Sequence, residues 1–146
     1  MILAKEAIEK AVNWWAEKIL EDRPHSNGDD SFTACLLADM GRQNITSDQA
    51  DTFKKALAKR MTEYAESGRF NHFSIMSDYG PCGMLIDAAN EAGISAANFP
   101  FKTTMFVTEK DGIIVRDGYG APAVKLWGVM SWARKRTRRQ RSRKSP

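Results

Sequence analysis

The chain has 146 residues, of which 42% are hydrophobic, and its net charge is +4. A chain of this length is typically one domain and can bury a core without a metal or disulfide staple. The N-terminus is charged within its first turn, and no apolar run approaches about 18 residues, so the patterns of a signal peptide and of a membrane-spanning helix are both absent. We therefore expect a soluble intracellular protein.

The charge is distributed unevenly along the chain. Residues 133–146 contain eight of the 22 Lys and Arg residues and no acid, which gives this segment a charge of +8. Residues 1–132 then have 14 basic and 18 acidic residues, a charge of −4. This asymmetry predicts one mildly acidic domain over residues 1–132 and a basic tail over 133–146, and it is typical of a folded unit with an arm for a polyanion.

The N-terminal part of the chain has helical periodicity. Over residues 3–22 the apolar residues recur with a spacing that places them on one helix face. This stripe consists of Ile8, Val12, Trp15 and Ile19. A second helix is expected over 31–43. A third is expected to begin at Thr46, which forms a capping-box pattern with Gln49, and to end at Gly68.

The periodicity then changes to that of strands. Residues 70–76 alternate as a strand does, and residues 79–93 predict a helix that begins near Pro81 and ends at Gly93. Further along, the spacing of apolar residues from Val124 onward predicts a last helix that continues toward the tail.

A β-hairpin is the clearest local signal. Residues 103–109 and 113–116 are rich in β-formers, and Asp111-Gly112 between them is a favoured two-residue turn. Together the segments predict an α+β domain, in which N-terminal helices precede a small antiparallel sheet with one inserted helix.

Three loops combine Gly with Asp, over residues 25–31, 77–83 and 117–122. A metal-dependent nuclease would need carboxylates and a base in such loops. The residues that could supply them are His25, Asp29, Asp30, His72, Asp78 and Asp117. Tight turns also select Asp beside Gly for purely structural reasons, which is the interpretation we favour. No nucleotide-binding glycine motif is present, and we expect neither a cofactor nor a metal.

The two cysteines, Cys35 and Cys82, are far apart and, with His25 and His72, lack zinc-finger spacing. We expect both to be small core residues.

Side chains that could contact a protein partner are aromatic or acidic and lie on the first helix, in the loops and near the C-terminus. They are Trp14, Trp127, Trp132, Asp29, Asp30, Asp78, Tyr79 and Tyr119. Neighbouring helix positions diverge by about 100°, so Trp14 and Trp15 cannot both point at one core.

The tail is expected to bind the phosphates of RNA or DNA, because Arg makes two-pronged phosphate contacts and stacks on bases. The cations concerned are Arg134, Lys135, Arg136, Arg138, Arg139, Arg141, Arg143 and Lys144.

Several phrases of the sequence, among them "AVNWWAEKIL", "SDYGP" and "DGYGAP", resemble a group of small accessory proteins carried by phages and mobile elements of gut bacteria. The resemblance covers about residues 8–122 and stops before the tail. It implies a bacterial cytoplasmic location and, by analogy of setting and size, an inhibitor of host defence such as an anti-CRISPR protein.

We therefore expect a non-enzymatic inhibitor whose partner is a protein or ribonucleoprotein, most concretely a Cas effector such as Cas9, with RNA or DNA held by the tail. One alternative is a nucleic-acid-binding accessory protein that uses the tail without reading sequence. A second is a small metal-dependent nuclease.

Overall fold

The computed structural model describes residues 3–21, 41–68, 71–118 and 120–128. Within these ranges the chain is α+β, as expected. Two helices, α1 (Lys5–Leu20) and α3 (Ser47–Glu66), precede a sheet into which a third helix, α4 (Gly83–Ala92), is inserted. The helix expected over 31–43 falls almost wholly outside the described residues, as does the basic tail.

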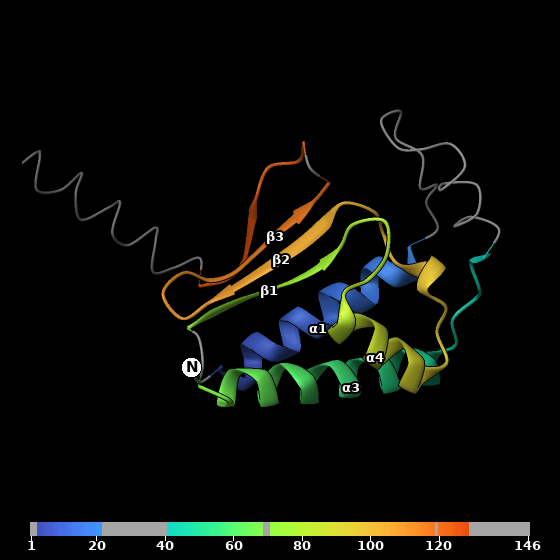
Figure 1. Ribbon diagram of the computed structural model, residues 1–146, viewed down its shortest axis with the longest axis horizontal. Coiled ribbons are helices and arrows are strands. Elements are labelled where there is room, and N and C mark those ends of the chain that lie inside the picture. The colour runs from blue at the N-terminus through green and yellow to red at the C-terminus, as the bar shows by residue number, and fades with distance from the viewer. Residues whose placement is uncertain (1–2, 22–40, 69–70, 119, 129–146) are drawn as a thin grey trace, which may run out of the picture.

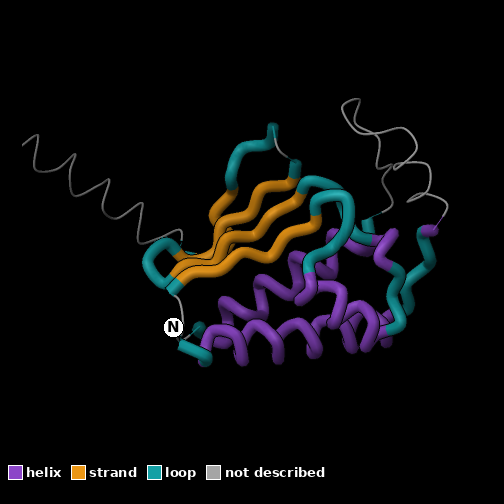
Figure 2. Tube along the Cα trace, viewed as in Figure 1, coloured by secondary structure: helices purple, strands orange, loops and turns teal. Residues whose placement is uncertain are grey.

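The sheet has four strands in the order β1-β2-β3-β4, each antiparallel to its neighbour. The strands are β1 (His72–Ser77), β2 (Thr103–Thr108), β3 (Gly112–Asp117) and β4 (Val124–Trp127). Figure 1 shows the described helices on one side of the sheet: α1 packs against β3 and β4, α4 packs against β1, and α3 packs against both helices. The opposite face of the sheet is covered by no described helix (Figure 2).

The core lies between the sheet and the helices. Alternate residues of β1, β2 and β3 point into it, so that Phe73, Val107 and Ile113 form one row across these three strands. From the helices, Trp15, Phe53 and other fully buried side chains meet these rows. The predicted stripe of the first helix is confirmed at three positions: Val12, Trp15 and Ile19 are buried, whereas Ile8 is half-buried.

The predicted cap of α3 is also confirmed. The Thr46 hydroxyl accepts a hydrogen bond from the Gln49 main-chain N–H at 3.1 Å, and the Gln49 side-chain oxygen accepts one from the Thr46 N–H at 3.0 Å. These bonds satisfy main-chain donors that the first turn of a helix leaves unpaired. At the other end, Gly68 has a φ of +71°, and Gly93 ends α4 with a φ of +70°.

The hairpin differs from its prediction in one respect. The register pairs Thr108 with Gly112, so three residues connect the strands and Asp111-Gly112 is not a two-residue turn. Gly112 is instead the first residue of β3, with a φ of +81°. Three-residue hairpin loops require such a left-handed residue after the turn, and this explains why glycine stands there.

The prediction of a helix from Val124 onward is wrong for the residues that the structure describes, because Val124–Trp127 is strand β4. The edge of β3 offers main-chain partners to this segment, and Val, Leu and Trp suit a half-buried strand. A short bulge between Ile113 and Ile114 adjusts the register. No helix in the described part of the chain is long and apolar enough to cross a bilayer.

Candidate nucleic-acid interface

The face of the sheet that turns away from the helices is covered by no helix in the described part of the chain. The strand register arranges its residues in three rows. The rows are Ser74–Phe106–Ile114–Lys125, Met76–Thr104–Arg116 and His72–Thr108–Gly112. We call this surface the outer sheet face. None of its ten positions carries a carboxylate.

Phe106 is at the centre of the outer sheet face. Its side chain is 45% exposed and makes no ring contact with another described aromatic residue. Ser74 and Ile114 lie directly beside it on the neighbouring strands. Phe106 therefore presents nearly half of its side chain to solvent, where a planar ligand could stack on it.

A hollow of about 560 Å³ adjoins this ring and extends over β1. Its lining includes the rings of Phe106 and Tyr64 and the hydroxyls of Ser74 and Thr108. Tyr64 comes from the last turns of α3, where its ring packs on Phe73 with centroids 4.9 Å apart. The hollow therefore combines aromatic surface with hydrogen-bonding groups.

The outer sheet face also carries positive charge. Arg116 is a diagonal neighbour of Phe106, at a distance of roughly 7–8 Å between such positions, and Lys125 lies across from Ile114. Neither cation forms an ion pair with a described residue. The acids that follow β2, Glu109 and Asp111, belong to the hairpin loop and not to the strand rows.

This arrangement suits a single-stranded nucleic acid. Bases stack on exposed aromatic rings irrespective of sequence, while Arg and Lys contact the phosphates. The base edges of a duplex are read by a helix or a two-stranded ribbon that enters a groove, and a broad sheet face provides neither.

Two of the three Gly/Asp loops that the sequence singled out meet at one end of the sheet. The Asp78 carbonyl accepts a hydrogen bond from Lys102 N–H at 2.7 Å, and the Lys102 carbonyl accepts one from Gly118 N–H at 3.0 Å. Lys102 itself has a φ of +53°, which is rare outside glycine. The loops are therefore brought together by main-chain bonds.

The side chains in these loops serve packing and ion pairing. Tyr79 stacks edge-on against Phe101, with ring centroids 5.2 Å apart, and Lys102 lies 5.8 Å from the Tyr79 ring. Asp117 accepts hydrogen bonds from Lys18 at 2.9 Å and from Thr103 at 3.3 Å. His72 is on the outer sheet face, away from both Asp78 and Asp117. Among the residues that the structure describes, no three His, Cys, Asp or Glu residues are grouped so as to hold a metal ion.

The pKa of Lys18 departs clearly from the ordinary value of a lysine. Burial is the largest single influence and lowers this pKa. The hydrogen bonds from the ammonium to Asp117 and Glu21, together with the charges of these carboxylates, outweigh it and raise the pKa above 10.5.

Two of the tryptophans expected to contact a partner, Trp14 and Trp127, are described, and both are half-buried. Trp14 packs edge-on against the buried Trp15 with centroids 5.0 Å apart, and the Lys18 ammonium lies 5.2 Å from its ring. Trp127 ends β4 and packs against the core.

The remaining predicted site residues, which include Asp29, Asp30, Tyr119, Trp132 and the eight tail cations, lie outside the described residues, as do His25 and Cys35. Cys82 is half-buried and its thiol is free.

The sequence patterns did not single out Phe106, Arg116 and Lys125, which the strand register brings together on the outer sheet face. The alternation within β2 and β3 does predict that these residues share a face. Thr104, Phe106 and Thr108 are alternate residues of β2 and point to one face, and Arg116 points to the same face from β3. The sequence alone does not say which parity the helices cover.

In comparisons with known proteins, no family model and no curated sequence matched this chain. Function must therefore be argued from the geometry of the surface.

Proposed function

We propose that the protein binds single-stranded nucleic acid without cleaving it, within a complex that also contains a nucleic-acid-handling protein. The outer sheet face carries this proposal. It combines an exposed aromatic ring, Phe106, with two cations that have no described ion-pair partner, and it has no carboxylate to repel phosphate.

The distribution of charge supports the second half of the proposal. The domain over residues 1–132 has a charge of −4 and the tail a charge of +8. Opposite signs on two parts of one chain suit a target that is itself protein plus nucleic acid, since each part meets a complementary surface. In the setting that the resemblance implies, this target is a CRISPR effector such as Cas9, and the bound protein inhibits it.

The nucleic-acid contact is tested by fluorescence anisotropy with the full-length protein and a labelled single-stranded RNA or DNA of mixed sequence. Phe106→Ala should weaken binding by about 1–3 kcal/mol, roughly five- to hundredfold, because a stacked base loses its platform. Leu20→Ala is the matched control, since Leu20 is 52% exposed but lies at the end of α1. Equal affinities of the Phe106 variant and the wild type would refute the outer sheet face as the contact.

The inhibitor hypothesis and its alternatives are separated by a pull-down from bacterial lysate with and without nuclease. Protein partners that persist after nuclease treatment support the inhibitor. Loss of every partner supports a plain nucleic-acid-binding accessory protein.

Purified protein with Mg²⁺ should leave RNA and DNA uncut. Cleavage that is abolished by Asp29→Ala, Asp30→Ala or Asp78→Ala would support the nuclease instead.

A further inference from the structure

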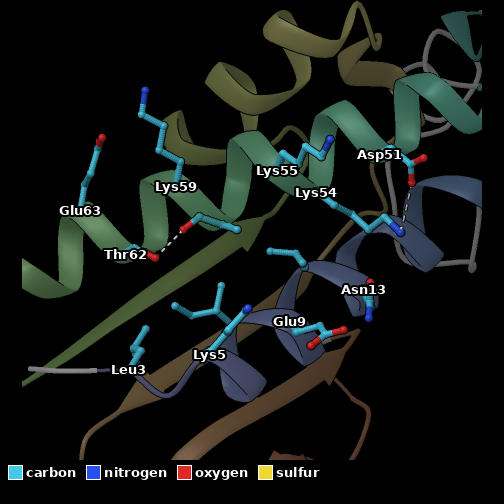
Figure 3. A pocket seen from close by; sticks show the side chains of 13 residues that line it. Leu3, Lys5, Glu9, Asn13, Asp51, Lys54, Lys55, Lys59, Thr62 and Glu63 are labelled. Carbon is cyan, nitrogen blue, oxygen red and sulfur yellow. Dashed lines mark hydrogen bonds and ion pairs between the residues drawn. The ribbon is translucent and has the colours of Figure 1, made fainter.

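A groove between α1 and α3 is a second surface with the features of a binding site. Its volume is about 890 Å³ (Figure 3). The two helices pack side by side, and the groove follows the line of their contact. Its apolar lining comes from both helices: Leu3, Ile8 and Val12 on the side of α1, and Ala58 on α3. This groove is separate from the outer sheet face.

The charged residues that line the groove are four lysines and three acids. Lys54 is engaged by Asp51, with 3.5 Å between the ammonium and the carboxylate. Lys5 on the α1 side, and Lys55 and Lys59 on α3, line the groove and form no ion pair with a described residue. The acids left on the rim are Glu9 and Glu63. Cations without a described partner therefore outnumber such acids.

From this combination we propose that the α1–α3 groove binds an acidic amphipathic helix of a protein partner. The lining extends from Leu3 to Asn13 on one side and from Asp51 to Glu63 on the other. At 1.5 Å per residue these stretches are roughly 15–18 Å long, which is about three turns of a docked helix. Apolar residues of that helix at i, i+3, i+4 and i+7 would enter the groove, and its carboxylates would meet the rim lysines.

Other occupants fit the surface less well. A second copy of the chain would bring the same lysine-bearing rim against itself, and like charges would then face one another. A nucleic acid would meet Glu9 and Glu63 and would find no aromatic side chain on which a base could stack. An acidic helix satisfies both the apolar floor and the excess of positive charge.

The probe for this proposal is a designed 18-residue peptide with Leu in an i, i+3, i+4, i+7 pattern and Glu at most other positions. Its counterpart has Lys in place of every Glu. Each is titrated into ¹⁵N-labelled full-length protein. The acidic peptide should shift amide resonances of α1 and α3, and the basic peptide should bind at least tenfold more weakly. Equal binding of both peptides, or shifts confined to the sheet, would overturn the proposal.

Variants locate the contact. Ala58→Arg fills the floor and should abolish binding of the acidic peptide, while K55E/K59E should weaken it at least tenfold. The double variant K10E/K110E makes the same change in net charge outside the groove and should bind like the wild type. Unchanged binding in the Ala58 variant would refute the site. A wild-type dimer in sedimentation experiments that Ala58→Arg converts to monomer would also refute the proposal, because a second copy of the chain would then occupy the groove.

The same variants separate this proposal from the nucleic-acid contact. Ala58→Arg should retain wild-type affinity for single-stranded RNA, whereas Phe106→Ala should retain affinity for the acidic peptide. The proposal for the groove and the proposal for the outer sheet face can therefore be refuted independently. The thermal midpoint of every variant should stay within a few degrees of the wild type, and circular dichroism verifies that a loss of binding is not a loss of fold.

Discussion

Lys18 connects the helical layer to the sheet. Its ammonium lies 3.1 Å from a carboxylate oxygen of Glu21, the residue that follows α1, and 2.9 Å from an Asp117 oxygen at the end of β3. The side chain is only 14% exposed, so solvent screens these contacts less than it screens a surface pair. One residue thus fixes the end of α1 against the sheet.

The raised pKa of Lys18 predicts a loss of stability at alkaline pH. Because the folded-state pKa lies above 10.5, the ordinary value for a lysine, the stabilisation is complete below pH 10.5 and is lost as the pH rises through the folded-state pKa. Lys18→Met should lower the free energy of unfolding by about 1–3 kcal/mol at pH 7. Urea denaturation at several pH values should show this difference shrinking above pH 10.5.

The control for Lys18 is Lys10→Met, since Lys10 is exposed on the same helix. It should change stability by less than about 0.5 kcal/mol at every pH. A difference between wild type and the Lys18 variant that stays constant up to strongly alkaline pH would show that packing, and not the ion pair, explains the loss.

Among the elements, the β2–β3 hairpin depends on one glycine. A Cβ at Gly112 would lie 2.4 Å from the main-chain oxygen of Trp127 at the end of β4. The backbone there also has a φ of +81°, which L-residues rarely adopt. Glycine is therefore required both by the hairpin and by the close approach of the neighbouring strand.

Gly112→Ala should accordingly destabilise the protein by about 2–4 kcal/mol, measured as the change in the free energy of unfolding in urea. Amide hydrogens of β4 should also exchange faster, because the substitution pushes that strand away from β3. Gly80→Ala is the matched control, since a Cβ there meets no atom within 4 Å. If both substitutions cost the same, the close contact with Trp127 does not determine the hairpin.

For the molecule as a whole, the layered arrangement separates the two surfaces for which we propose binding. The helices cover one face of the sheet and leave the other open, and the groove lies between two of those helices (Figures 1 and 3). A partner that engages both surfaces would gain from effective concentration, because the second contact forms within the complex.

The tail should add affinity for nucleic acid without adding sequence preference. Replacing Arg134, Arg136, Arg138 and Arg139 with Ala should flatten the slope of log K against log[salt] by about 3, since each phosphate contact contributes roughly 0.7–0.9. Anisotropy titrations at several salt concentrations measure this slope. Affinity for all sequences should fall alike.

Phe106→Ala provides the contrast for the tail variant. It removes a ring and no charge, so it should weaken binding while leaving the salt slope unchanged. A slope that is insensitive to all four tail substitutions would show that the tail does not contact phosphate.

Much of the fold follows from local patterns. The apolar stripe of the first helix, the Thr46–Gln49 cap and the alternation of Phe73 and Ile75 each depend on residues within a few positions of one another. Such patterns report the preference of a segment for helix or strand, and they also indicate one buried side. The uneven charge of the chain was likewise readable without coordinates.

Tertiary structure decided the rest. Val124–Trp127 is a strand because the edge of β3 was available to pair with it, although its spacing favoured a helix. Phe106 is exposed because the helices cover the opposite face of β2, and it meets Arg116 only through the strand register. The groove joins stretches of α1 and α3 that are about forty to sixty residues apart in sequence. The physical reason is common to all three: a segment's own residues set its conformational preference, whereas burial and proximity depend on which distant segment packs against it.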